Sequence, residues 1–194
     1  MTDLRRLAVY CGSSNRVSPA YLTLAYTLGA ELATRGIGVV YGGGSVGLMN
    51  EVAQGAMDKG GEVIGVITER LLALEVARHD LTELHVVKGM HARKLKMCDL
   101  SDAFVALPGG YGTLDELFEA VTWTQLNVHH KPVALLDIDG FFEHLVSFLD
   151  HAAGEGFIRP PHRSLIGRYT SIDALLAGLK SAEIPVFGKW VAEP

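Results

Sequence analysis

Short apolar runs alternate along the chain with longer segments whose apolar residues recur at helical spacing. The apolar runs predict six strands, at residues 7–11, 37–41, 62–67, 83–87, 103–106 and 132–136. The periodic segments predict helices at residues 19–35, 48–59, 90–101, 113–125, 141–153 and 172–179. Residues 68–80 are polar and have no clear period, so no element is predicted there. Beyond the last helix we expect a loose tail.

The alternation of strands and helices favours one fold class. Several of the predicted strands are apolar throughout, which is typical of parallel strands covered on both faces. The pattern therefore predicts an α/β fold, a doubly wound, Rossmann-like parallel sheet with helices on both faces. The 194 residues fit one compact domain, and no linker or repeat divides them. We therefore expect a single domain over residues 1–194.

Composition excludes several classes of protein. The chain is 48% hydrophobic and 20% charged, which excludes intrinsic disorder. Its net charge of −5 lacks the basic excess of proteins that bind nucleic-acid phosphates, so we expect no nucleic-acid partner. No secretory signal and no uncharged run of about 18 residues is found, so no membrane partner is expected. The spacing of Cys11 and Cys98 fits neither a metal site nor a redox pair, which indicates a cytoplasmic setting.

Glycine is over-represented, at 22 of 194 residues, or about 11% against a usual value of about 7%. Many glycines lie in three segments that follow predicted strands, at residues 12–14, 42–47 and 108–113. Small residues let the backbone approach an oxygen-rich ligand, and N–H groups at a helix start attract negative charge. Because the carboxyl ends of parallel strands share one edge, these turns predict a phosphate or nucleotide site there.

A dinucleotide is an alternative ligand. Gly42-x-Gly44-x-x-Gly47 matches the dinucleotide fingerprint, which is usually followed by an acidic residue about 20 positions later, at the end of the next strand. Glu62 has that distance but stands at the start of its strand, whereas Glu69 is nearer the correct end. The fingerprint follows the second strand, and a dinucleotide leaves the other glycine loop unexplained. We therefore favour a mononucleotide or phosphate, with NAD as the alternative.

Arg93 interrupts an apolar helix face. It shares that face with Met90, Met97 and Leu100, which are spaced by three or four residues. A buried guanidinium requires a carboxylate or phosphate partner. The spacing leaves two interpretations open. Arg93 either binds a ligand or makes a structural pair with an acid such as Asp102.

Glu116 also has two interpretations. Thr113-Leu-Asp-Glu116 matches a capping box, in which the glutamate bonds back to the start of its helix. Leu114 and Phe118 are expected on the packing face of that helix. Glu116 lies instead on the side of Thr113, which looks back toward the glycine-rich turn. The spacing alone favours the cap over a residue that faces a ligand.

Other candidate residues are less specific. Lys94 can reach a phosphate, although a solvated lysine is the commoner outcome. Met90, Tyr111 and Trp123 can stack on a base, but equally can belong to the core or an interface. The sequence contains no recognisable Ser-His-Asp arrangement and no cluster of metal ligands, so neither a triad nor a metal is predicted.

Two motifs resemble those of the LONELY GUY (LOG) family of cytokinin-activating phosphoribohydrolases. Met90-His-Ala-Arg-Lys94 matches the family's MHxRK motif, and PGGYGTLDE, which ends at Glu116, matches its PGGxGTxxE motif. Residues 11–14 and 41–49 also resemble family segments, and order and spacing agree over about residues 7–179. One departure is Asn50, where family members commonly carry glycine.

The resemblance implies a reaction and the residues that carry it. The reaction is hydrolysis of the N-glycosidic bond of AMP or N6-prenyl-AMP to free base and ribose 5-phosphate, with no cofactor. The family's catalytic arginine and glutamate fall on Arg93 and Glu116. A homodimer with the site near its interface is also implied. The residues implied to bind substrate and its phosphate are Ser14, Gly43, Gly44, Met90, Arg93, Lys94, Gly109, Gly110, Tyr111, Gly112, Thr113 and Glu116.

Of two other functions, one is rejected and one is kept as an alternative. Family members have often been labelled lysine decarboxylases, but that chemistry needs a Schiff-base lysine and a pyridoxal phosphate site, for which the sequence has no motif. The same fold resembles molybdenum-cofactor carriers, which bind a phosphorylated ligand without turning it over. A non-catalytic nucleotide or molybdenum-cofactor carrier is therefore the alternative to the enzyme.

Overall fold

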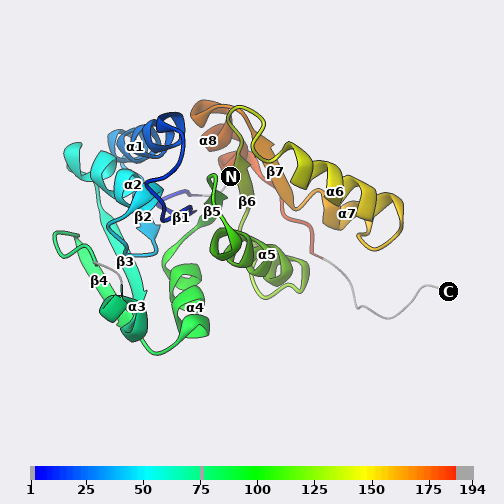
Figure 1. Ribbon diagram of the computed structural model, residues 1–194. Helices are drawn as coiled ribbons and strands as arrows, with labels where there is room; N and C mark the ends of the chain where they lie inside the picture. The colour runs from blue at the N-terminus through cyan, green and yellow to red at the C-terminus, as the bar shows by residue number, and fades with distance from the viewer. Residues whose placement is uncertain (1–2, 75–76, 187–194) are drawn as a thin grey trace.

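The computed structural model describes residues 3–74 and 77–186, in which strands and helices alternate (Figure 1). The strands are β1 (Arg6–Tyr10), β2 (Gly38–Tyr41), β3 (Val63–Thr68), β4 (Glu83–Val87), β5 (Ala103–Ala106), β6 (Val133–Leu136) and β7 (Ile166–Tyr169). The helices are α1 (Pro19–Thr34), α2 (Gly47–Asp58), α3 (Glu69–Leu74), α4 (Met90–Leu100), α5 (Tyr111–Gln125), α6 (Glu143–Gly154), α7 (Pro160–Arg163) and α8 (Ile172–Ser181). Every predicted strand and helix is present, with its bounds shifted by two residues or fewer.

The strands form one sheet in the order β4-β3-β2-β1-β5-β6-β7, and every pairing is parallel. β1 is central, with β2 on one side and β5 on the other. The direction of winding changes between β1 and β5, and open α/β sheets bind ligands at such a switch point, beyond the carboxyl ends of the strands. The glycine-rich turns after β1, β2 and β5 all leave from this edge.

Helices cover both faces of the sheet, which confirms the predicted doubly wound fold (Figure 1). On one face, α1, α2 and α8 bury residues such as Leu28, Val52 and Leu175 against the sheet. On the other face, α4 and α5 bury Met97 and Leu117, and α6 adds partly buried residues. The two helices that carry the MHxRK and PGGxGTxxE motifs therefore pack on the same face.

Three elements of the described residues have no signal in the sequence pattern. One of them, α7, spans only the four residues Pro160–Arg163, too few to show a helical period. α3 is six residues long and buries no side chain, so it lacks the apolar face that marks a helix. β7 is a partly exposed edge strand in which Gly167 and Arg168 interrupt the apolar run. The loose tail expected at the end of the chain lies partly outside the described residues. Within residues 3–74 and 77–186, no helix has the length and apolar character needed to cross a membrane.

Candidate active site

Hydrogen bonds join the glycine-rich turns at the carboxyl edge of the sheet. The N–H of Gly12 donates to the carbonyl of Pro108 at 3.1 Å, which links the turns after β1 and β5. The N–H of Gly47 donates to Asn15 Oδ1 at 2.8 Å, which links the turn after β1 to the start of α2. Gly47 has φ of 64° and lies so close to Ser14 that a side chain could not fit. Hydrogen bonds therefore join the three turns to one another at the carboxyl edge of the sheet.

The turn after β5 also requires glycine, because a side chain there would collide with Thr113. A Cβ at Gly109 would lie 2.0 Å from Thr113 Oγ1 and 2.6 Å from Thr113 Cβ. Thr113 is buried and belongs to the first turn of α5, whose N-cap is Gly110. The N–H groups of this first turn are therefore directed at the edge where an anion would bind. The capping-box interpretation of Thr113 is wrong, because the N-cap of α5 is Gly110, three residues before Thr113.

Arg93 lies on the buried side of α4, with its side chain 8% exposed. Its Nε donates to the carbonyl of Val66 at 2.8 Å, and its Nη2 donates to the carbonyl of Gly42 at 3.3 Å. The remaining nitrogen, Nη1, donates to Glu116 Oε1 at 2.6 Å. The alternative pairing of Arg93 with Asp102 is wrong, because Asp102 accepts bonds from backbone N–H groups at the other edge of the sheet.

Glu116 faces Arg93 from α5, and its side chain is 11% exposed. Burial raises the pKa of the Glu116 carboxyl above its ordinary value, although the Arg93 guanidinium favours the charged form. A carboxyl whose pKa is raised and which lies beside a fixed cation is typical of functional sites. The two residues implied by the resemblance are therefore a contacting pair at the end of β1, β2 and β5.

Three other residues predicted to bind substrate, Met90, Lys94 and Tyr111, lie on the same two helices as this pair. Met90 Sδ lies 3.5 Å from Arg93 Nη1. The Lys94 ammonium is paired with Asp115 at 3.1 Å and Glu119 at 2.9 Å, so it links α4 to α5. Burial by itself lowers the pKa of Lys94, but the two carboxylates have the larger combined effect, so the pKa is raised. Tyr111 is 94% exposed at the start of α5.

A cavity of about 300 Å³ opens at the switch point between β1 and β5. Its lining contains three residues predicted to bind substrate, Ser14, Gly109 and Gly110. Gly12, Ser13 and Pro108 in its lining belong to the predicted glycine-rich turns. It also contains residues that the sequence does not single out: Val17, Tyr21, Leu48 and Phe141. The rings of Tyr21 and Phe141 meet edge to face at 5.6 Å and form an aromatic wall. Phe141 follows β6 closely, which places it at the same edge.

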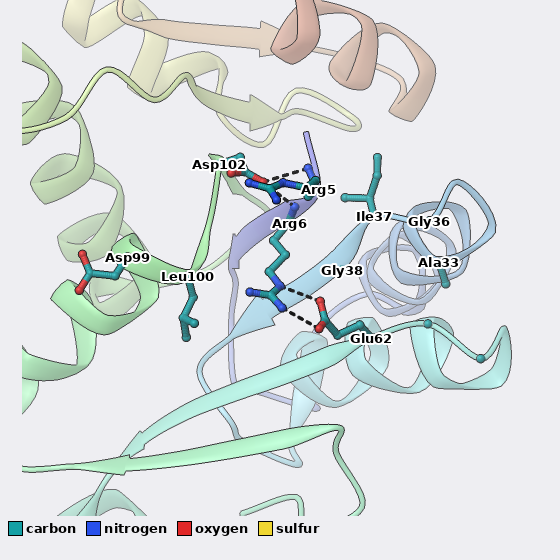
Figure 2. A pocket seen from close by; sticks show the side chains of 12 residues that line it. Arg5, Arg6, Ala33, Gly36, Ile37, Gly38, Glu62, Asp99, Leu100 and Asp102 are labelled. Carbon is teal, nitrogen blue, oxygen red and sulfur yellow. Dashed lines mark hydrogen bonds and ion pairs between the residues drawn. The ribbon is translucent and has the colours of Figure 1, made fainter. Parts of the chain in front are cut away.

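A second cavity, of about 550 Å³, lies at the opposite edge of the sheet (Figure 2). Glu62, which lines it, is paired with Arg6, whose Nε and Nη2 donate to it at 2.7 and 2.8 Å. Asp102 accepts the N–H groups of Arg5 and Arg6. Glu62 is therefore remote from the glycine loops and cannot bind a ribose there, which removes one of the two acids considered for NAD. Glu69 begins α3 directly after β3, at the carboxyl edge.

The described residues contain no group of three or more His, Cys, Asp or Glu side chains that could hold a metal ion. The polar groups at the carboxyl edge include the backbone N–H groups of the turns, the Arg93 guanidinium and the Glu116 carboxyl. Such a set can bind a phosphate through the backbone and place opposite charges beside a sugar. This arrangement suits the cleavage of a phosphorylated ligand.

Comparison with known proteins identifies the family. Residues 49–179 match the family model described as "Possible lysine decarboxylase". The cytokinin riboside 5′-monophosphate phosphoribohydrolase LOG of Oryza sativa subsp. japonica is 51% identical over 162 residues, 84% of this chain and 67% of the relative. The phosphoribohydrolase LOG3 of Arabidopsis thaliana is 50% identical over 165 residues, 85% of this chain and 77% of the relative.

Solved structures share the fold. The molybdenum cofactor binding protein of Rippkaea orientalis superposes with a TM-score of 0.70 at 24% identity, covering 93% of this chain and 98% of that one. The molybdenum cofactor carrier protein of Chlamydomonas reinhardtii gives 0.69 at 24% identity, covering 91% and 96%. At this identity the likeness shows the fold alone. The two relatives at about half identity and the matched motifs show that the chain belongs to the LONELY GUY family of cytokinin riboside 5′-monophosphate phosphoribohydrolases.

Proposed function

We propose that this protein hydrolyses the N-glycosidic bond of adenosine 5′-monophosphates, with or without an N6-prenyl group, to free base and ribose 5-phosphate. The observation that carries the proposal is the buried contact between Arg93 and Glu116 beside three joined glycine-rich turns. Relatives at about 50% identity are named for this activity. A carboxylate can stabilise the positive charge that develops during glycosidic cleavage, and a cation can offset the negative charge on the departing base.

In the proposed reaction, water adds across the bond between ribose C1′ and the base nitrogen. The water oxygen bonds to C1′, the electron pair of the broken bond leaves with the base, and a proton from water ends on the base. Positive charge develops at C1′, which the Glu116 carboxylate stabilises directly or by accepting a proton from the attacking water. Arg93 supplies a permanent cation that holds the substrate and offsets the negative charge on the departing base.

The 5′-phosphate is proposed to lie at the first turn of α5. The Gly109–Gly110 turn, Gly112 and Thr113 offer backbone N–H groups or a hydroxyl at a helix N-terminus. Gly43, Gly44 and Ser14 would line the same cleft, because their loops adjoin that turn. Met90 and Tyr111 would contact the base, and Lys94 would act near the phosphate only by exchanging one of its carboxylate partners.

The direct test is release of base by the purified protein. AMP and N6-prenyl-AMP are incubated separately with the protein, and free base and ribose 5-phosphate are measured by chromatography. Both products should appear in equal amounts, while adenosine, which lacks the phosphate, should be cleaved far more slowly. The ratio of kcat/KM for the two nucleotides identifies the preferred base. Saturable AMP binding with no base released from either nucleotide would replace the enzyme with a carrier, and NAD binding that AMP does not displace would favour a dinucleotide.

The homodimer is proposed to form through the exposed side of α5. Leu114 and Phe118, expected on the packing face, are only partly buried and line a shallow depression with Tyr111 and Trp123. An apolar face of this kind beside the site is typical of an interface between identical subunits. Sedimentation analysis should give twice the chain mass, and Phe118→Glu should shift it toward the monomer.

The proposed compartment is the cytoplasm. Cys11 and Cys98 are both free thiols and both buried. Burial raises the pKa of each thiol, so neither is a reactive thiolate. Two unpaired cysteines of this kind suit a reducing compartment. Fractionation of cells that produce the protein would test this.

A further inference from the structure

Residues 77–80, called the strap below, cross the glycine-rich loop that follows β2. Ala77 forms an isolated antiparallel bridge with Gly44. The N–H of Arg78 donates to the carbonyl of Gly43 at 3.1 Å. The loop that carries two of the proposed substrate-binding glycines is therefore held by main-chain bonds from a segment that belongs to a different connection.

The side chain of Arg78 fastens the strap to α2. It is only 11% exposed, and each of the three nitrogens of its guanidinium donates at least one hydrogen bond. Nη1 donates to Asn50 Oδ1 at 3.0 Å, and Nη2 donates to Gln54 Oε1. Nε and Nη2 both donate to Asp80, at 2.8 and 3.1 Å. A planar guanidinium can serve these acceptors together, whereas an ammonium cannot.

The loop beneath the strap also holds the proposed catalytic arginine. The carbonyl of Gly42 accepts from Arg93 Nη2 at 3.3 Å. A Cβ at Gly42 would lie 2.2 Å from that nitrogen and 2.9 Å from Met49 Sδ, so the loop backbone and the guanidinium are in close contact with no room for a side chain between them. A displacement of the loop would therefore displace Arg93.

We propose that Arg78, held by Asn50, is a positioning residue that fixes the loop after β2 and through it both Arg93 and the substrate. The inference rests on the proposed function and adds residues outside the family motifs. It also gives Asn50 a role, because the side-chain oxygen at a position where glycine is common in the family serves here as the acceptor for Arg78. The Arg78 side chain bonds to Asn50, Gln54 and Asp80, not to Arg93 or Glu116.

The first test compares Arg78→Ala and Arg78→Lys with Arg70→Ala, which removes an exposed arginine from α3 in the same connection. Each variant is assayed well below its melting temperature for kcat on AMP, and by calorimetry for the Kd of AMP. We expect Arg78→Ala to lower kcat or to weaken AMP binding by roughly ten- to hundredfold, since a misplaced group costs about that much. Arg78→Lys should recover only part of the loss, and Arg70→Ala should match the wild type.

The second test is a double-mutant cycle between Asn50 and Arg78. Asn50→Ala removes the acceptor and should reproduce part of the Arg78→Ala loss, with no added effect in the double variant. Asn50→Asp keeps an acceptor oxygen and should retain activity. Wild-type kcat and Kd in Arg78→Ala, or fully additive losses in the cycle, would overturn the positioning role. Absence of base release by the wild type would contradict the proposed function instead, and the Kd values would still decide the role of Arg78.

Discussion

Arg93 Nη1 donates to Glu116 Oε1 at 2.6 Å, joining two helices through residues 23 positions apart in the chain. Both side chains are almost fully buried, at 8% and 11% exposure. Arg93 is also held by two backbone carbonyls, so its orientation does not depend on Glu116 alone. Arg93 is therefore held by the backbone independently of Glu116, and a substitution of Glu116 leaves these two bonds in place.

The first prediction concerns Glu116→Gln. Glutamine keeps an oxygen that can accept from Arg93 but cannot carry the negative charge that the proposed reaction uses. We expect the variant to fold and to bind AMP, while kcat for base release falls by about 10² to 10⁴. Calorimetry measures the binding and chromatography the release. Glu143→Gln, which changes an exposed glutamate at the start of α6, is the control and should keep wild-type kcat. Unchanged turnover in Glu116→Gln would exclude Glu116 as a catalytic residue.

The second prediction is a pH profile. Glu116 must be ionised to stabilise C1′ or to accept a proton, and burial raises its pKa above the ordinary value of 4.5. As pH falls, the group takes up its proton earlier than an exposed glutamate would. The acid limb of kcat/KM for AMP should therefore lie above pH 4.5. Full activity down to that pH, in protein whose circular dichroism is unchanged, would contradict the role of the carboxylate.

Six of the seven described strands and the two motif helices could be predicted from the sequence, because each carries a short, mainly apolar run or an apolar face at helical spacing. Neighbours in space were harder to predict. Thr113 and Glu116 fit a capping box by spacing, but Gly110 is the N-cap, so the helix start decides against that interpretation. The partner of Arg93 lies on another helix, and only the packing of α4 and α5 on one face of the sheet identifies it.

Residues outside the motifs were missed for a similar reason. Tyr21 belongs to α1 and Phe141 follows β6, and their edge-to-face contact depends on how those elements meet at the switch point. Arg78 lies in a stretch without hydrophobic period, so nothing in the pattern directs it to Asn50. Local patterns report which face a residue occupies, whereas these contacts depend on the tertiary arrangement.

The third prediction tests the turn after β5 with Gly109→Ala. The added Cβ would lie 2.0 Å from Thr113 Oγ1, so the turn or the first turn of α5 must shift. We expect AMP affinity to fall by tenfold or more, because the backbone N–H groups of this turn would no longer converge on the phosphate. Gly154→Ala in α6, where a Cβ meets nothing within 4 Å, is the matched control and should leave the Kd unchanged. Equal Kd values in both variants would place the phosphate elsewhere.

The fourth prediction concerns stability and the buried His129, 8% exposed beside the ring of Phe104. Burial, with Lys131 nearby, lowers the pKa of His129 to about 4 from its ordinary value of 6.5. Between these values the unfolded chain binds a proton that the folded chain does not. Stability from this group is therefore present above pH 6.5 and is lost as pH falls toward 4. The loss between pH 7 and pH 5 should be about 2 kcal/mol.

Urea unfolding at the two pH values measures this loss, and His129→Asn isolates it. The Asn amide oxygen can take the place of Nδ1, which accepts from the N–H of Lys131, but it does not titrate. The variant should be less stable at pH 7, because ring packing is lost, yet its stability should change less between pH 7 and pH 5. His151→Asn, at an exposed position on α6, should keep the wild-type difference. If His129→Asn keeps that difference as well, another group accounts for the acid sensitivity, because removal of the buried imidazole must remove its proton uptake.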